Sequence, residues 1–270
     1  HQAVDAATTG KAGFIPGVAW PTVTDSTAGL SYAQEHDIRD YAADLTYVDP
    51  WGPYPCWDAL EPYSYSKGAN LRSYIAARQV RDFTDRTFPA PRRPRLLAFP
   101  HGLQSAAWVT QPEAAAMDIL SFFLARFEAA TLYAFPKGYD NRFWAWQAQA
   151  NATIARWENI VFRGQPFEGL TVVPESPYPD PVGSDRTYFP DLPPNALLQA
   201  VGYRHDGGIL AAVGNFWEKG EVFFRLTVAG LDERQAYAVL DPEGRRLFAA
   251  AAGDAHTGAD LARGVLLHAG

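Results

Sequence analysis

Two aspartates stand where carboxylates could carry acid–base chemistry. Asp49 follows an apolar run that predicts a strand at 44–48, and Asp140 follows another predicted strand and directly precedes a predicted helix. Two carboxyl groups that face one substrate can act as general acid and as base or nucleophile, provided their environments keep one protonated and the other ionised. The alternatives are structural, because Asp49 with Pro50 suits a turn and Asp140 suits the cap of a helix starting at Asn141.

Aromatic residues gather in the loops that follow the predicted strands. Eight Trp contribute to an aromatic content of 14%, and flat aromatic faces beside polar groups suit sugar rings and their hydroxyls. The alternatives are ordinary packing under long loops and, for the charged members, a salt-bridged rim. The candidate substrate-binding residues are Trp20, Trp51, Tyr54, Trp57, Asp58, His101, Gln104, Trp108, Lys137 and Tyr139.

The elements that must position these residues alternate between strands and helices up to Gly164. Apolar runs predict the strands 17–20, 44–48, 95–99 and 130–135. Helical periodicity predicts the helices 31–43, 70–86, 112–127 and 141–162. Four strand–helix units in a row are typical of a parallel sheet covered by helices. In a barrel of such units the loops after the strands share one rim, so we expect the candidate residues to meet there.

The pattern changes to antiparallel strands beyond Gly164. Seven prolines between 174 and 194 predict an extended connector. The turn His205-Asp206-Gly207-Gly208 predicts a hairpin of strands 197–204 and 209–216. Further strands are predicted at 222–228, 236–240, 245–250 and 264–268. We therefore expect an α/β region at 1–165, a connector at 166–195 and a small antiparallel β-sandwich at 196–270.

Four strand–helix units make a partial (β/α)8 barrel, which needs eight. The parallel sheet would then keep an open edge, a costly arrangement for a sheet that is buried on both faces. The start at His1 resembles the tail of an earlier helix. We expect either a missing N-terminal half or a second copy of the chain to cover the open edge.

Composition and missing motifs exclude several classes of function. The formal net charge of -7 and a pI near 5.4 argue against a nucleic-acid surface. No apolar run approaches the roughly 20 residues that span a bilayer, so no membrane partner is expected. The scattered His residues and the lone Cys56 predict no metal site, and no glycine-rich phosphate loop predicts a cofactor. A single cysteine leaves the cellular compartment open.

The order of these motifs resembles the second half of a glycoside hydrolase barrel. The resemblance lies in Val48-Asp49-Pro50, the strands Leu96–Phe99 and Leu132–Phe135, Thr110-Gln111-Pro112-Glu113 before a helix, and a helix holding Trp144 to Trp157. The segments Ala211–Trp217 and Glu221–Phe224 resemble the β-sandwich that often follows such barrels. The resemblance implies a carbohydrate-active class. Together with the positions of Asp49 and Asp140 after predicted strands, it leads us to expect hydrolysis of glycosidic bonds in an oligo- or polysaccharide, with these two residues as the catalytic candidates. A non-catalytic carbohydrate-binding or structural module is the alternative, because Pro100-His101-Gly102 stand where one large clan has a Glu.

Overall fold

The computed structural model describes residues 17–19, 59–64, 70–87, 90, 93, 95–100, 111–130, 141–175, 178, 195–217, 220–241 and 255–269. The chain divides into two compact units, His1–Ile154 and Ala155–Gly270. The first contains parallel strands with helices between them, and the second contains antiparallel strands. The coarse expectation of an α/β region followed by an antiparallel β region is therefore confirmed.

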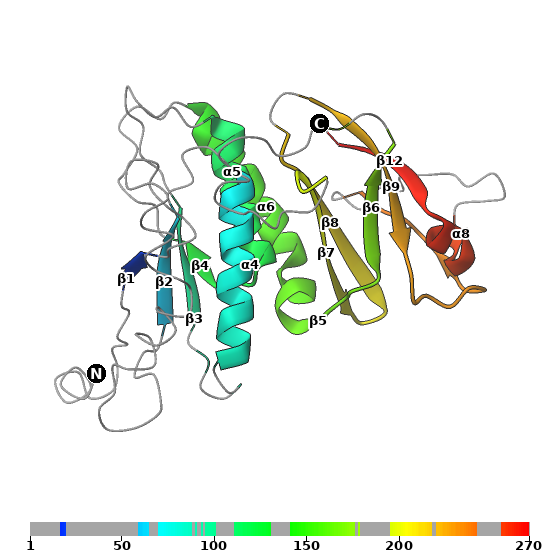
Figure 1. Cartoon of the computed structure of the whole chain (residues 1–270), viewed down its shortest axis with the longest axis horizontal. Coiled ribbons are helices and arrows are strands. Elements are labelled where there is room, and N and C mark those ends of the chain that lie inside the picture. Colours follow the sequence, from blue (N-terminus) through cyan, green and yellow to red (C-terminus); the bar gives the residue numbers. More distant parts are fainter. Residues whose placement is uncertain are drawn as a thin grey trace. The chain divides into compact units, whose positions relative to one another are not determined.

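The first unit is built on a four-stranded sheet in the order β1-β2-β3-β4 (Figure 1). Its strands are β1 (Gly17–Ala19), β2 (Ala59–Ser64), β3 (Arg95–Pro100) and β4 (Ala129–Ala130). Every neighbouring pair is parallel. Parallel neighbours cannot be joined by a tight turn, so the chain must cross over the sheet between them.

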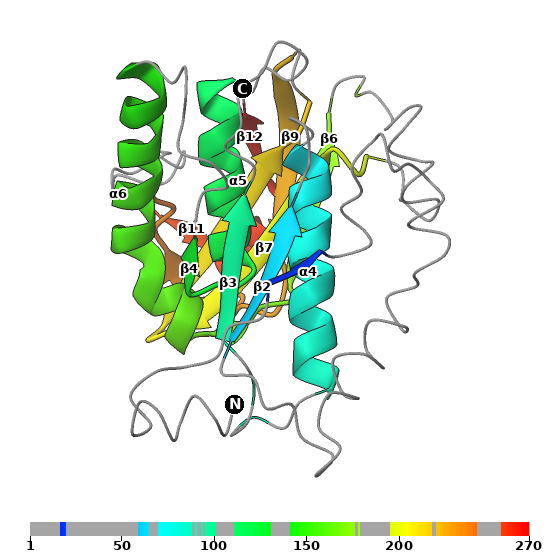
Figure 2. The ribbon, with the colours of Figure 1, turned by 90° about the vertical axis from the view of Figure 1, so that its left-hand side faces the viewer.

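Helices supply these crossovers. α4 (Asn70–Thr87) connects β2 to β3, and α5 (Pro112–Leu124) connects β3 to β4. α4 and α5 lie side by side on the same face of the sheet (Figure 2). The helices predicted at 70–86, 112–127 and 141–162 are confirmed, the third as α6 (Asn141–Arg163). Both crossovers on one face mean that the sheet winds in a single direction.

The contact between α5 and α6 follows from helical periodicity. On α6, Trp146, Ala150 and Ile154 recur every four residues and so share one face. They pack against Ala116 and Ile119 of α5 in one apolar cluster. Ala150 is 2% exposed, so this position of α6 is enclosed by the cluster.

The second strand of the sheet, β2 (Ala59–Ser64), was not predicted. It pairs directly with β1 on one side and β3 on the other. The strand predicted at 44–48 lies outside the described residues. The residues of β2 do not have the pattern of a strand. Glu61 and Pro62 interrupt the apolar residues, and Pro62 has no N–H to donate to a neighbouring strand.

The second unit contains two three-stranded antiparallel sheets. One is formed by β5 (Gln165–Pro166), β7 (Leu198–His205) and β8 (Gly208–Asn215). The other is formed by β6 (Leu170–Pro174), β9 (Val222–Val228) and β12 (Val265–Ala269). A short pair, β10 (Ala236–Tyr237) with β11 (His256–Thr257), precedes α8 (Gly258–Arg263). β5 and β6 fall within the range expected as a connector, and the strand predicted at 245–250 lies outside the described residues.

The predicted hairpin is confirmed, and its turn has the expected backbone. Asp206 and Gly207 have φ values of 47° and 76°, as the two central residues of a tight hairpin turn require. Glycine adopts this conformation without strain, and aspartate tolerates it better than most residues. The turn therefore sets the register in which His205 faces Gly208.

The core of the second unit collects inward-facing side chains from both of its three-stranded sheets. On β9 the side chains of Val222, Phe224, Leu226 and Val228 are buried, which confirms the alternation expected at 222–228. Leu198 of β7 and Leu261 of α8 join the same cluster. Burying each such side chain contributes about 1.5–3 kcal/mol before the cost of ordering it.

Candidate functional site

The carboxyl ends of the parallel strands meet at one edge of the sheet. Tyr63 of β2 is the register partner of both Ala19 of β1 and Phe99 of β3. The chain therefore leaves β1, β2 and β3 at nearly the same level. This carboxyl-terminal edge is where open and closed parallel sheets carry their ligand sites.

The residues expected to meet there lie outside the described part of the chain. This holds for Asp49, Asp140, Trp20, Trp51, Tyr54, Trp57, Asp58, His101, Gln104, Trp108, Lys137 and Tyr139. Along the chain, Trp20 directly follows β1 and His101 directly follows β3, while Asp140 directly precedes α6. Asp49 and the aromatic cluster 51–57 belong to the long connection between β1 and β2, and Asp58 directly precedes β2. Their proximity to one another stays a prediction.

Among the described residues, a buried polar contact links the helices that start near this edge. Asn70, the first residue of α4, donates from Nδ2 to Oδ1 of Asp118 at 2.6 Å and to the Ala114 carbonyl at 2.7 Å. Asn70 and Asp118 are 8% and 4% exposed. An amide has two donor hydrogens, and both are used here. The first turn of α4 is thereby fixed against the first turns of α5.

Neither Asn70 nor Asp118 was predicted from the sequence as a functional or structural residue. The sequence nevertheless indicates a polar contact on α5. Asp118 interrupts its apolar run, and a buried carboxylate needs a hydrogen-bonding partner. Its partner is 48 residues away in sequence. Only the packing of α4 against α5 makes the pairing visible.

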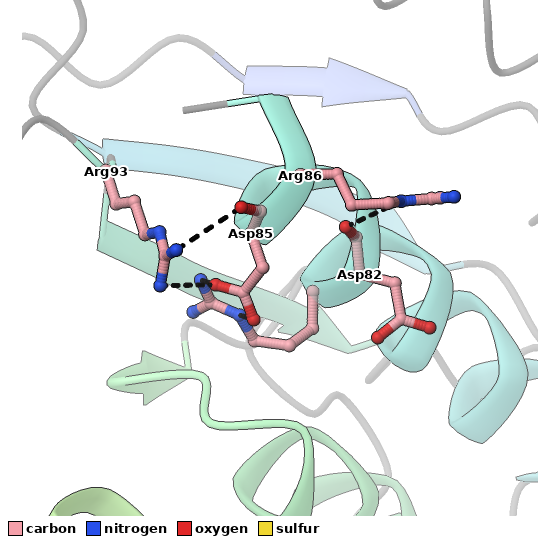
Figure 3. A network of polar contacts seen from close by, with 5 residues as sticks. Asp82, Asp85, Arg86 and Arg93 are labelled. Carbon is pink, nitrogen blue, oxygen red and sulfur yellow. Dashed lines mark hydrogen bonds and ion pairs between the residues drawn. The ribbon is translucent and has the colours of Figure 1, made fainter. Parts of the chain in front are cut away.

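The opposite end of α4 carries an exposed network of ion pairs (Figure 3). Asp85 accepts from Arg81 one turn earlier, and its Oδ1 lies 2.9 Å from Nη1 of Arg93. Arg93 also donates to the Asp85 carbonyl at 3.3 Å, and Arg86 donates to the Asp82 carbonyl at 3.1 Å. Arginines at a helix C-terminus satisfy its last carbonyls.

This network lies where α4 connects to β3, at the edge where parallel strands begin. In parallel α/β proteins that edge serves stability, and the other serves function. The Asp85 carboxylate is already paired with two guanidinium groups and is open to water. We therefore assign the network a structural role and do not count its aspartates as candidates for chemistry.

The second unit holds an asparagine whose side chain is fully used. Oδ1 of Asn215 accepts from the Tyr178 hydroxyl at 2.7 Å and from the Trp217 backbone N–H at 3.1 Å. Its Nδ2 donates to the Gly220 carbonyl at 3.0 Å and, more weakly, to the Ala269 carbonyl at 3.5 Å. Burial raises the pKa of Tyr178 well above the ordinary value, because the phenolate would lose its hydration. This cluster fixes the end of β8.

Grouped metal ligands and membrane-length apolar helices are both absent from the described residues. Within them, no three or more His, Cys, Asp or Glu side chains come together as a metal site. None of the helices in the described ranges is long and apolar enough to span a membrane.

Comparison with known proteins adds no family to these observations. No protein-family model matches the chain, and none of the curated proteins or solved structures matches it.

Proposed function

We propose that this chain is a glycoside hydrolase-like protein that hydrolyses glycosidic bonds of an oligo- or polysaccharide. The observation that carries the proposal is the sheet order β1-β2-β3-β4, with every pair parallel and α4 and α5 on one face. Adding each strand on the same side of the last is how a (β/α)8 barrel is built, whereas a doubly wound sheet reverses its order.

In this proposal β1 to β4 are part of a (β/α)8 barrel, and the two sheets of the second unit pack as a small β-sandwich. The shared apolar cluster of those two sheets supports the second assignment. The remaining barrel strands would come from a preceding N-terminal half or from a second copy of the chain. Either partner would cover the outer edge of β1, with which no other strand of the described residues pairs besides β2.

Asp49 and Asp140 are the proposed acid and base or nucleophile. Glycoside hydrolysis uses two carboxyl groups on opposite sides of the scissile bond, roughly 5 to 9.5 Å apart. Trp20 and His101 are the binding residues with the firmest support, because they directly follow β1 and β3 at the carboxyl-terminal edge. Asp58 directly precedes β2 and so adjoins the opposite edge, whereas the other candidate binding residues follow β1, β3 or β4 along the chain.

The test is hydrolysis by the full chain, measured as reducing sugar released from soluble starch, xylan and hydroxyethyl cellulose and as phenol released from aryl glycosides. We expect Asp49→Asn and Asp140→Asn to lower turnover on the order of 10²–10⁴-fold. Asn keeps the turn and helix-capping preferences of Asp, so the unfolding midpoint should not change.

Asp82→Asn is the matched control, since Asp82 is an exposed aspartate near the opposite end of α4. Its turnover should equal that of the unchanged chain. Full activity in both Asp49→Asn and Asp140→Asn would overturn the assignment of these residues. Binding of a polysaccharide without any hydrolysis would support the alternative, a non-catalytic carbohydrate-binding module.

A further inference from the structure

The sheet β6-β9-β12 (Figure 1) has one face on which large apolar side chains are exposed. Val173, Phe223 and Leu266 are 51%, 52% and 49% exposed, one on each strand. Their neighbours along β9, Val222 and Phe224, are buried because successive side chains of a strand point to opposite faces. The face is therefore the exposed side of three strands whose other side belongs to the core.

An aromatic pair lies at one end of this face. Phe223 and His268 are directly opposite one another on β9 and β12, and their ring centroids are 4.8 Å apart with 37° between the planes. Nε2 of His268 lies 3.2 Å from Oε2 of Glu221. The two rings thus form a single exposed platform with a carboxylate beside it.

A positioned guanidinium occupies the middle of the face. Arg225 lies between Leu266 and Val173 in the strand register. Its Nε donates to Glu175 at 2.6 Å and its Nη1 to the Gly264 carbonyl at 3.3 Å. Among the described residues Nη2 of Arg225 has no hydrogen-bonding partner, so this nitrogen is available to a ligand hydroxyl.

The mixture of groups decides what such a face can bind. A charged side chain separates Val173 from Leu266, so the exposed carbons do not form one continuous apolar patch of the kind that marks protein docking. Two carboxylates face one guanidinium and one imidazole, a balance that attracts neither a nucleic-acid backbone nor an anionic membrane. A sugar chain offers C–H faces to stack on rings and hydroxyls for carboxylates and guanidinium.

We propose that this face is a second carbohydrate-binding site, in which a polysaccharide chain stacks on Phe223 and His268. Arg225, Glu175 and Glu221 hydrogen-bond its hydroxyls. The choice of a carbohydrate rests on the proposed function of the chain, and the position of the site does not. The site lies on the second unit, so it would hold a polymer independently of the residues that cleave it.

The test is retardation of the full chain in native gels that contain soluble starch, xylan or hydroxyethyl cellulose. We expect at least one polymer to slow the unchanged chain, and Phe223→Ala and Phe223→Leu to weaken binding about tenfold. Phe223→Leu keeps an apolar side chain and removes the aromatic ring. Weaker polymer binding by this variant would therefore identify stacking on the ring. Leu240→Ala is the matched control, since Leu240 is 48% exposed and outside β6, β9 and β12.

Three results would overturn the inference. The first is retardation that Phe223→Ala leaves unchanged, and the second is no retardation by any of the three polymers. The third is sedimentation of a dimer that Phe223→Ala converts to a monomer, which would make the face an interface between copies.

Hydrolysis of a short aryl glycoside separates this inference from the proposed function. If Phe223→Ala hydrolyses it normally but loses polymer binding, both stand. If the chain hydrolyses nothing but Phe223→Ala still loses polymer binding, the further site stands and the hydrolase proposal fails. If hydrolysis is present and Phe223→Ala binds polymer normally, only the further site fails.

Discussion

Asn70 and Asp118 form a buried hydrogen bond of 2.6 Å between the first residue of α4 and the second turn of α5. Because the same amide also binds the Ala114 carbonyl, one side chain determines how the two helix starts lie against each other. Both helices begin near the carboxyl-terminal edge of the sheet. The connections that enter α4 and α5 thus end at fixed points, whatever course they take in between.

We expect this contact to contribute substantially to stability. Asn70→Ala removes both donors and leaves a buried carboxylate with fewer partners, which costs about 1–3 kcal/mol of unfolding free energy. Asn70→Asp should cost more at neutral pH, because it adds a second carboxylate against Asp118. The additional loss of unfolding free energy in Asn70→Asp, relative to Asn70→Ala, should become smaller as the pH falls, because one of the two carboxyl groups then takes up a proton. Urea unfolding followed by circular dichroism at neutral and acidic pH measures both effects.

Gln149→Ala controls for the loss of an amide side chain. Gln149 is exposed in the middle of α6, where alanine is a good helix former, and the change should be nearly neutral. Equal unfolding midpoints for Asn70→Ala and Gln149→Ala would show that the buried contact adds nothing to stability.

The parts of the fold that could be predicted are those encoded by neighbouring residues. The helices α4, α5 and α6 were predicted from spacings of three and four residues, which are local. The hairpin of β7 and β8 was predicted because Asp206-Gly207 can adopt the backbone that a two-residue turn needs. The buried face of β9 was predicted from the alternation of apolar and other residues along the strand, which is also a local pattern.

The parts that were missed depend on distant partners. β2 contains Glu61 and Pro62 and is a strand because it lies between β1 and β3. β6 is five residues long, and its Leu170 pairs with Val228 more than fifty residues later. The contact of Asn70 with Asp118 is of the same kind. Spacing along the sequence cannot report a pairing that exists only after the elements pack.

The pH dependence of Asp260 gives a prediction at the start of α8. Its carboxylate accepts from the Thr257 hydroxyl at 2.7 Å and the Thr257 backbone N–H at 2.9 Å, and Arg263 also donates to it. These contacts, the Thr257 hydroxyl first, lower the pKa of Asp260 from 3.8 to about 2. A lowered folded-state pKa means that the stabilisation is present above 3.8 and is lost as the pH falls towards 2.

Carboxyl NMR of the folded chain should therefore show Asp260 titrating near pH 2. The difference in unfolding midpoint between the unchanged chain and Asp260→Asn should narrow as the pH is lowered through that window. A midpoint of titration near the ordinary value would contradict the capping arrangement of Thr257 and Asp260.

Tyr178 gives a prediction with the opposite sign. Burial raises the pKa of its phenol, so its contribution to stability is complete below the ordinary value of 10 and is lost as the pH rises above it. At about pH 11, ionisation of exposed tyrosines changes the absorbance at 295 nm, and Tyr178→Phe should leave the amplitude unaltered. The same variant should cost about 0.5–1.5 kcal/mol at neutral pH through the lost bond to Asn215. A smaller amplitude in Tyr178→Phe would mean that Tyr178 ionises normally.

Gly264, which separates α8 from β12, gives the sharpest test of backbone geometry. Its φ of 98° and ψ of 145° lie in a region that is essentially restricted to glycine. A Cβ there would also lie 2.6 Å from Cγ of Arg225 and 2.9 Å from Cγ2 of Thr227. We expect Gly264→Ala to cost about 1–3 kcal/mol from the backbone alone, and more if Arg225 must move away from Glu175. Gly207→Ala is the matched control, because Gly207 also has a positive φ but a Cβ would contact nothing within 4 Å. Urea unfolding should show a clearly larger loss for Gly264→Ala, and equal losses would mean that the close approach of Arg225 does not require a glycine.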